Sequence, residues 1–438
     1  MQYLPNIIFA IILIAGIGYF TKNVRLLIRN IKLGKPVDAS DSSSQRWKNV
    51  VQIALGQSKM VKRPIAGFLH VIVYIGFIII NIEVLEIIID GLLGTHRIGL
   101  EILPLSVYGF LIGSFEILAL LVLVSVIVFW LRRNIIKLKR FLSAEMKGWP
   151  KQDGNLILYF EVVLMCLFLI MNAADIEFQN MASGNIISQF IAPWFEGFSE
   201  NTLHIIERTA WWLHIVGILV FLNYLYFSKH LHIILAFPNV YYGRVNPQGQ
   251  FNNLDAVTKE VMLMMDPNAD PFAAPPESED DGEPEKFGAS DVMDLSQVQL
   301  LNAYTCTECG RCTSECPANQ TGKKLSPRKI MMDTRDRLEE VGKNITANKG
   351  VFKPDDKQLL NDYITKEELW ACTSCNACVE ACPVSIDPLS IIMDMRRYLV
   401  MEESAAPMEL NNMMTNIENN GAPWPYNQMD RLNWANEQ

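Results

Sequence analysis

Eight of the nine cysteines in this 438-residue chain fall in two short runs with identical spacing. Each run reads C-x2-C-x2-C-x3-C-P, and the runs occupy residues 306–317 and 372–383. In bacterial [4Fe–4S] proteins this spacing lets three thiolates wrap three corners of a cubane, while the fourth, held before a proline, reaches the other cluster. We therefore predict two [4Fe–4S] clusters with eight ligands, which are Cys306, Cys309, Cys312, Cys316, Cys372, Cys375, Cys378 and Cys382.

Exchange of the fourth ligand divides these thiolates into two sets. One predicted cluster takes Cys306, Cys309, Cys312 and Cys382, and the other takes Cys372, Cys375, Cys378 and Cys316. The alternative of two zinc sites is disfavoured, because structural zinc rarely uses successive C-x2-C steps closed by C-P. The ninth cysteine, Cys166, lies in an apolar stretch and is predicted to be a core residue.

The connection between the two runs carries a helix signature. Ser326 and Pro327 match an N-cap and first turn, and Gly342 matches a residue just past a helix end. Asp387 and Pro388 predict a second helix start after the second run. A long helical insert between the runs favours an α-helical ferredoxin-like arrangement, similar to the end of succinate dehydrogenase iron–sulfur subunits.

Five apolar stretches are long enough to cross a bilayer as helices, because lipid requires backbone polar groups to be satisfied within the segment. They are residues 5–20, 65–89, 105–131, 156–173 and 209–235. No lysine or arginine precedes the first stretch, and several follow it. The first stretch is therefore predicted to be an uncleaved anchor and not a signal peptide.

The distribution of lysine and arginine predicts the orientation of these spans. The connections 21–64 and 132–151 are rich in both, whereas 90–103 and 175–207 have almost none. Basic loops stay on the cytoplasmic side. We expect a prokaryotic inner (cytoplasmic) membrane protein with its N-terminus outside and the cysteine runs in the cytoplasm, where grouped thiols stay reduced.

Histidines near the membrane predict a b-type haem. His214 and His232 are 18 residues apart in the last predicted span, so on one helix they would share a face about 27 Å apart. Such a separation suits two haems on opposite sides of a bilayer. His70 lies at the depth of His232, and we predict one haem between them. His230 is the alternative to His232, His214 is the site for a second haem, and interfacial histidines without haem are the remaining possibility.

With these features, the first 245 residues resemble the gamma-subunit-like cytochrome b membrane domain of respiratory nitrate reductase. The resemblance rests on five spans, an outside N-terminus, His70 in the second span, and His214 with His232 in the fifth. It implies two haems held by two histidines from each of these spans. This chain has a single histidine in its second span, which departs from the pattern.

From about Asp294 onward the chain resembles the iron–sulfur part of heterodisulfide reductase-related proteins. The matching stretches are residues 306–317, 326–341 and 372–383. Longer relatives continue into a cysteine-rich CCG module that does thiol or disulfide-type chemistry. The resemblance implies a separate partner subunit that carries this module, or another cytoplasmic redox subunit.

Together these observations predict an all-α chain, a five-helix transmembrane bundle followed by an α-helical ferredoxin-like dicluster domain. The predicted parts are a cytochrome b-like domain (1–245), an acidic proline-rich linker (246–295), a two-[4Fe–4S] domain (296–403) and a C-terminal tail for partner docking (404–438). A nucleic-acid partner is excluded, because the net charge is −9 and basic residues flank apolar segments.

The predicted function is electron transfer within an oxidoreductase complex. Electrons would pass between a cytoplasmic redox partner and the membrane quinone pool. One alternative, a catalytic reductase subunit, is disfavoured because the chain has no flavin or dinucleotide fingerprint. The other is an iron–sulfur redox sensor or scaffold without haem.

Overall fold

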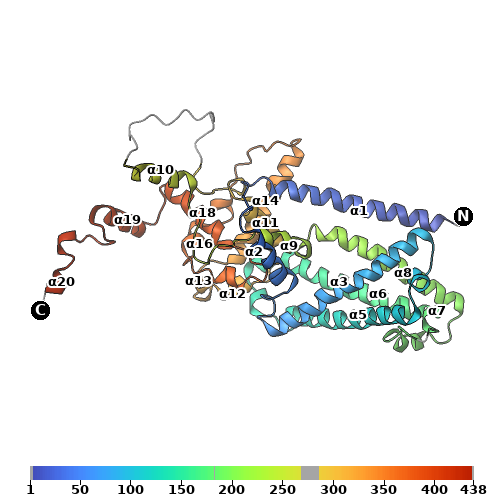
Figure 1. Cartoon of the computed structure of the whole chain (residues 1–438). Coiled ribbons are helices and arrows are strands. Elements are labelled where there is room, and N and C mark those ends of the chain that lie inside the picture. Colours follow the sequence, from blue (N-terminus) through green and yellow to red (C-terminus); the bar gives the residue numbers. More distant parts are fainter. Residues whose placement is uncertain (1–2, 182, 268–285, 437–438) are drawn as a thin grey trace.

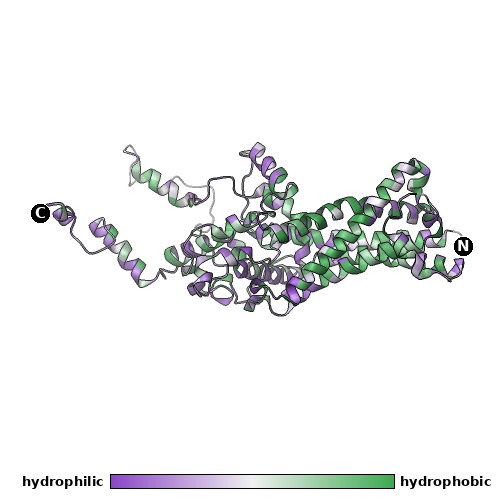
Figure 2. Cartoon of the chain, turned by 90° about the horizontal axis from the view of Figure 1, so that it is seen from below, coloured by the Kyte–Doolittle hydropathy of each residue, from purple (hydrophilic) through white to green (hydrophobic). Residues whose placement is uncertain are grey.

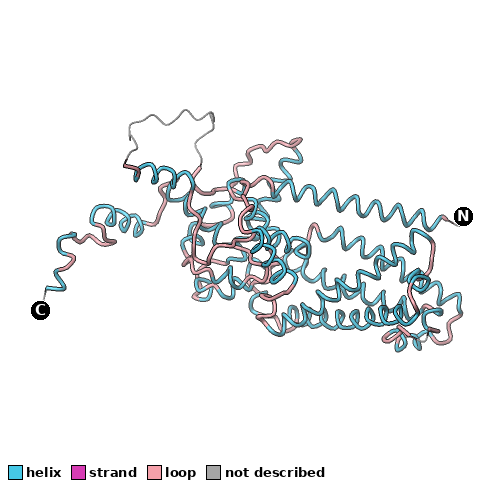
Figure 3. The backbone as a smooth tube through the Cα atoms, in the orientation of Figure 1, coloured by secondary structure: helices cyan, strands magenta, loops and turns pink. Residues whose placement is uncertain are grey.

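The structure is a computed structural model that describes residues 3–181, 183–267 and 286–436. Over these residues Figure 3 shows helices joined by loops, without a β-strand. The only β-type pairings in the described part are two isolated bridges. The prediction of a helical chain is confirmed for these residues.

Five long helices form a bundle at one end of the molecule (Figure 1). They are α1 (Leu4–Ile31), α3 (Pro64–Leu93), α5 (Leu105–Asn134), α6 (Trp149–Ala174) and α8 (Glu200–Leu225). Helix α6 packs on α5 and α8, α3 packs on α5, and α1 contacts α3 and α8. Each is long and apolar enough to cross a membrane, and Figure 2 shows hydrophobic residues concentrated on this half. The five predicted spans are confirmed as candidates, which supports membrane association.

The last predicted span is not one helix. The structure has α8, then η6 (Lys229–Leu231), then α9 (His232–Tyr242). The chain breaks at Ser228, whose hydroxyl accepts a hydrogen bond from the N–H of His230 at 3.1 Å and so caps a new helix. His214 and His232 therefore lie on different helices, and the predicted shared face five turns apart is wrong. Apolar composition continues across the break, so hydropathy alone did not reveal it.

The other half of the molecule holds the cysteine runs among short helices packed around α14. The helices are η7 (Val292–Asp294), α11 (Gln297–Thr305), α12 (Arg311–Glu315), α13 (Pro317–Gln320), α14 (Pro327–Ala347), α15 (Leu359–Asp362), α16 (Lys366–Trp370), α17 (Ala377–Ala381) and α18 (Pro388–Met401). Both predicted helix starts are confirmed. Ser326 accepts a hydrogen bond from the N–H of Lys329, and Asp387 accepts one from the N–H of Ser390.

Gly342 does not end its helix as predicted, because α14 continues past it to Ala347. A Cβ at this position would overlap the side-chain amide of Asn30 in α1. The glycine therefore allows close helix packing between the two halves, and Asn30 also donates a hydrogen bond to the hydroxyl of Tyr304 at 3.0 Å.

The two halves pack directly on each other. Helix α9 lies against α11, and α1 contacts both α11 and α14. The predicted linker, 246–295, is partly structured: it contains α10 (Asp255–Met265), and Val292 and Leu295 are buried in the cysteine-run half. Residues 268–285 of that linker lie outside the described residues.

Shorter helices complete the chain. At the cysteine-run side of the bundle they are α2 (Ser43–Asn49), η1 (Val50–Leu55), η2 (Lys139–Phe141) and η3 (Ala144–Met146), and at the far end they are α4 (Ile98–Ile102), α7 (Ile176–Gln179), η4 (Ser188–Phe190) and η5 (Ala192–Phe195). The C-terminal tail forms α19 (Met408–Asn420), η8 (Gln428–Asp430) and α20 (Asn433–Asn436). Figure 1 shows this tail extending away from the rest of the chain.

A buried ionic network closes the far end of the bundle. Asp175 accepts a hydrogen bond from Nε of Arg97 at 2.7 Å, and its carboxylate lies 3.2 Å from Nε2 of His96. Arg208 contacts the other ring nitrogen of His96 at 3.3 Å and pairs with Glu207. Arg97 and Arg208 carry two positive charges that balance the carboxylates of Asp175 and Glu207. The group of His96, Asp175 and Glu207 therefore needs no bound cation for charge balance.

Candidate metal centres

The two cysteine runs lie side by side, because α12 and α17 pack against each other. Their loops have matching backbone conformations. Glu308 and Ser374 have positive φ angles of 55° and 56°, and Gly310 and Asn376, two residues later, have 71° and 59°. Two left-handed residues within each loop turn the chain tightly, which brings three successive cysteines toward one point.

The first group of thiols includes one from the second run. Burial raises the pKa of Cys306 to about 12, and the neighbouring charges of Cys309 and Cys382 raise it as well. Burial also raises the pKa of Cys312, and the charges of Cys306, Cys309, Cys382 and Cys378 contribute in the same direction. Cys382 therefore acts on thiols of the first run, and the predicted exchange of the fourth ligand stays a prediction.

The second group includes one thiol from the first run. Burial raises the pKa of Cys378, and the charges of Cys372 and Cys316 add to this effect. Cys316 also acts on Cys372. Cys375 is the exposed member of this run. These charge effects are those expected if each cysteine run lies near the last cysteine of the other run.

This donor set fits two [4Fe–4S] clusters. A thiol with a raised pKa stays protonated in a buried site unless a metal ion replaces the proton, since the metal binds the thiolate. Two such groups of four thiols, with the helices that carry them in contact, satisfy the ligand requirement of two cubanes.

An ionic bridge joins the first run to the bundle. Glu308, between two of the cysteines, is only 3% exposed. Its carboxylate pairs with Nζ of Lys229 in η6 and with Nη1 of Arg335 in α14, the latter at 2.8 Å. Burial raises the pKa of Glu308, but the charges of Lys229 and Arg335 hold it below its ordinary value. The ionised carboxylate thus links both halves of the molecule.

Two of the predicted histidines face each other beside this bridge. The ring centroids of His70 and His232 are 6.4 Å apart, with the ring planes inclined by 44°. Two imidazoles on opposite sides of one metal would have centroids about 6.3 Å apart, for metal–nitrogen bonds of about 2 Å. Nδ1 of His232 lies 3.2 Å from the carbonyl oxygen of Lys229, and as a donor there it leaves Nε2 free to bind a metal.

The other two histidines are placed differently. His230 stands edge-on to His232 with centroids 5.4 Å apart, and its Nε2 lies 3.8 Å from Glu161. His214 is 1% exposed and packs on Phe168 of α6, with ring centroids 6.1 Å apart. Among the described residues no other histidine ring contacts His214.

Arg311, in the first cysteine run, connects the thiols with the histidines. Its guanidinium donates to the carbonyl oxygen of Met60 at 3.2 Å and contacts the sulfur of Met60 at 3.0 Å, just before α3 begins. The positive charge of Arg311 interacts electrostatically with Cys309 and Cys382, and also with the ring of His70. The first thiol group therefore lies next to the histidine pair.

Glu308, Lys229 and Arg311 were not identified from the sequence. Charged residues between cluster-binding cysteines are a visible signal, but their partners are far away in the chain, and a spacing motif does not specify them.

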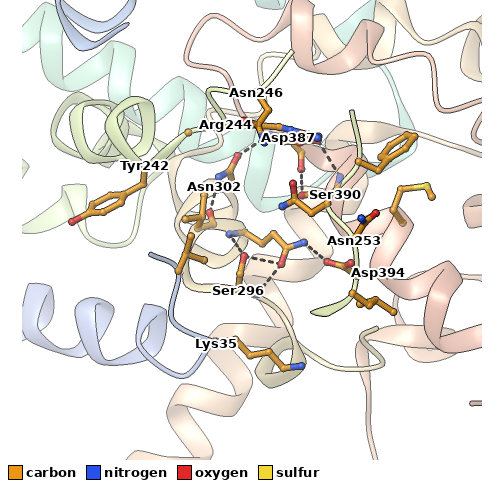
Figure 4. A pocket seen from close by; sticks show the side chains of 18 of the residues that line it. Lys35, Tyr242, Arg244, Asn246, Asn253, Ser296, Asn302, Asp387, Ser390 and Asp394 are labelled. Carbon is orange, nitrogen blue, oxygen red and sulfur yellow. Dashed lines mark hydrogen bonds between the residues drawn. The ribbon is translucent and has the colours of Figure 1, made fainter. Parts of the chain in front are cut away.

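A separate cavity of about 490 Å³ lies between the two halves (Figure 4). Arg244, Asp387 and Ser390 are among its polar lining residues, and Asp387 accepts a hydrogen bond from the N–H of Ser390 at 3.0 Å. Its described lining includes no cysteine or histidine. This cavity is therefore distinct from the metal centres.

The comparisons with known proteins agree with the thiol geometry. A family model described as a 4Fe-4S dicluster domain matches residues 305–386, which include all eight cysteines. No solved structure matches the chain.

Three relatives are informative. The chain is 30% identical to "Probable iron-sulfur-binding oxidoreductase FadF" of Bacillus subtilis, over 98% of this chain and 61% of the relative. It is 26% identical to "EtfAB:quinone oxidoreductase" of Syntrophomonas wolfei, over 92% of this chain and 55% of the relative. One of the subunits of a ferredoxin/F(420)H(2)-dependent CoB-CoM heterodisulfide reductase of Methanosarcina acetivorans is 32% identical over 27% of this chain and 60% of the relative.

The chain spans little more than half the length of the first two relatives. It carries a 4Fe-4S dicluster domain. Its similarity to iron–sulfur oxidoreductases, including heterodisulfide reductase subunits, supports a role in electron transfer.

Proposed function

We propose that this chain is a membrane-bound electron-transfer subunit of an oxidoreductase complex, passing electrons between a redox partner and the membrane quinone pool. The observation that carries the proposal is the His70–His232 pair, whose ring centroids are 6.4 Å apart beside the first cysteine run. A metal-binding histidine pair next to a cluster loop is the arrangement that a path from cluster to membrane requires.

In this proposal the two [4Fe–4S] clusters exchange ligands, with Cys382 bound to the first and Cys316 to the second. A haem b is held by His70 and His232. These groups supply one-electron exchange when bound. The carbonyl of Lys229 orients the His232 ring, and Cys306, Cys316 and Cys378 are buried away from water.

We assign one haem to the chain. His230 has Glu161 as a neighbour, so His232 is the better ligand. His214 is not adopted as a ligand, because its ring packs on Phe168 and it lacks a facing histidine among the described residues. The bundle is then a reduced form of a nitrate reductase gamma-subunit-like domain, with the haem at its cluster side.

The proposed partners follow from the same reasoning. Quinone is supported by similarity to a protein named EtfAB:quinone oxidoreductase. A CCG-module or other redox subunit is supported by similarity to a heterodisulfide reductase subunit. The exposed C-terminal tail, with Trp424 57% and Trp434 75% exposed, is the proposed docking segment. From the distribution of lysine and arginine we also propose that the cysteine-run half lies in the cytoplasm and the N-terminus outside.

Absorption spectra of the purified full-length protein test the proposal. We expect a reduced-minus-oxidised spectrum of b-type haem that is lost in His70→Ala and in His232→Ala. The matched control is His204→Ala, which removes an exposed histidine of α8 and should retain the spectrum. A preparation with eight irons and no haem, or a spectrum unchanged in both variants, would contradict the haem assignment and favour a sensor or scaffold.

A further inference from the structure

A second cavity, of about 420 Å³, opens where the bundle meets the cysteine-run half. The start of α3 and the end of α5 form its walls, and Ser314 of the first cysteine run closes one side. Its basic lining residues are Lys62, Arg63, Arg132, Lys139 and Arg140, and none of the described lining residues is acidic. Its described lining includes no cysteine or histidine.

Three of the five cations lack a compensating charge. Arg63 pairs with Glu315 at 2.7 Å, and Lys62 pairs with Glu380. No ion pair involves Arg132, Lys139 or Arg140 in the part of the chain that the structure describes. The pocket therefore concentrates positive charge that an anion would neutralise.

Arg140 is the most buried of these three unpaired cations. Its Nε is buried and has no hydrogen-bond partner. Burial lowers the pKa of Arg140, the charge of Cys309 raises it, and the charges of Arg63, Arg311 and Arg132 lower it. These cations repel one another across the pocket, and the first turn of α3 adds the positive end of a helix dipole.

The position of the pocket identifies the source of the anion. Ile65, which lines the pocket, is 62% exposed, and Ile135 and Ile136, just after α5, are each 62% exposed. Apolar side chains exposed at the ends of spanning helices face acyl chains. The pocket thus lies at the depth of lipid headgroups, between two membrane helices, and basic pockets at that place bind anionic headgroups.

We propose that this pocket binds the phosphate headgroup of an anionic phospholipid from the leaflet on the cysteine-run side. The acyl chains lie along Ile65 and the apolar ends of α3 and α5. Because Ser314 belongs to the first cysteine run, the bound lipid contacts both halves and holds the cluster domain on the bundle. This inference does not depend on haem or quinone.

Native mass spectrometry of the detergent-solubilised full-length chain tests the proposal. The protein is incubated with an equimolar mixture of phosphatidylglycerol and phosphatidylcholine. We expect preferential retention of phosphatidylglycerol. Each basic residue near an anionic lipid surface contributes about a fivefold gain in affinity, so Arg132→Gln with Lys139→Gln should reduce the preference by about 25-fold.

Two further variants separate the pocket from general charge effects. Lys147→Gln with Lys151→Gln removes two exposed cations from the same connection, outside the pocket, and should keep the preference. Arg132→Lys keeps the positive charge and should also keep the preference for phosphatidylglycerol. The thermal midpoint in phosphatidylcholine alone should match the wild type in every variant, which establishes that the variants fold.

Equal retention of both lipids by the wild type, or an unchanged preference in the Arg132→Gln, Lys139→Gln variant, would overturn the proposal. Inorganic phosphate distinguishes a lipid from a free anion. If phosphate raises the thermal midpoint as much as phosphatidylglycerol does, the pocket is a site for a soluble anion and the lipid assignment fails.

Discussion

Glu308 is the residue whose replacement best tests how the two halves are joined. Its buried carboxylate is shared between Lys229, beside the histidine pair, and Arg335 in α14. Glu308→Gln keeps the size of the side chain and removes its charge. Two cations, with side chains 8% and 15% exposed, would then face a neutral amide.

The loss of stability in Glu308→Gln depends on which polar partners Lys229 and Arg335 retain. Removal of one partner from a buried ion pair costs about 3–5 kcal/mol. Lys229 keeps the carbonyl oxygen of Pro150 at 2.7 Å and Asp153 at 3.7 Å, and Arg335 keeps Asp336 at 3.1 Å. We therefore expect a loss near the lower limit, about 3 kcal/mol.

Thermal unfolding of the full-length protein measures this loss. If the cysteine-run half unfolds as a unit, a change of about 3 kcal/mol lowers the midpoint by about 6 °C or more. Glu315→Gln is the matched control, because it makes the same substitution in the same run. Glu315 and its partner Arg63 are 51% and 33% exposed, and such a pair contributes about 0–1 kcal/mol. Equal midpoints for the two variants would refute the buried bridge.

Two further predictions concern the thiols and the far end of the bundle. Cys382→Ser should alter the same cluster signal in electron paramagnetic resonance as Cys309→Ser, and a different signal from Cys316→Ser; if Cys316→Ser, and not Cys382→Ser, alters the signal that Cys309→Ser alters, ligand exchange is contradicted. A hydrogen bond to Asp175 raises the pKa of His96, so its stabilisation is complete below about pH 6.5 and is lost as the pH rises through the higher folded pKa. The thermal midpoint should fall as the pH rises above about 6.5 in the wild type and less so in His96→Gln, and equal falls would exclude this contribution.

The sequence was most informative where the signal is local. Five spans follow from the composition of each stretch, and the helix starts at Ser326 and Asp387 follow from capping chemistry within a few residues. The break at Ser228 was missed, because apolar residues continue on both sides and one hydroxyl decides it. Gly342 was misread for a related reason, since only the approach of Asn30 from a distant helix shows why glycine is needed there.

The candidate site shows the same difference between local and long-range signals. A fixed spacing specifies the cysteines, but the ionic contacts that orient their loops join residues far apart in sequence, such as Lys229 with Glu308. The pairing of His70 with His232 was inferred from depth alone. Its premise of a continuous last span was wrong, yet the ring centroids of His70 and His232 are 6.4 Å apart.

Comparison of the two runs shows how two copies of one motif can occupy different positions on an electron path. Glu308 and Arg311 in the first run correspond to Ser374 and Ala377 in the second. Glu308 and Arg311 both bind the bundle side, through Lys229 and Met60. At the matching positions, Ser374 and Ala377, the second run carries no charge. Its second cysteine, Cys375, is exposed. Under the proposed function the second cluster therefore meets the redox partner, and the first passes the electron to or from the histidine pair.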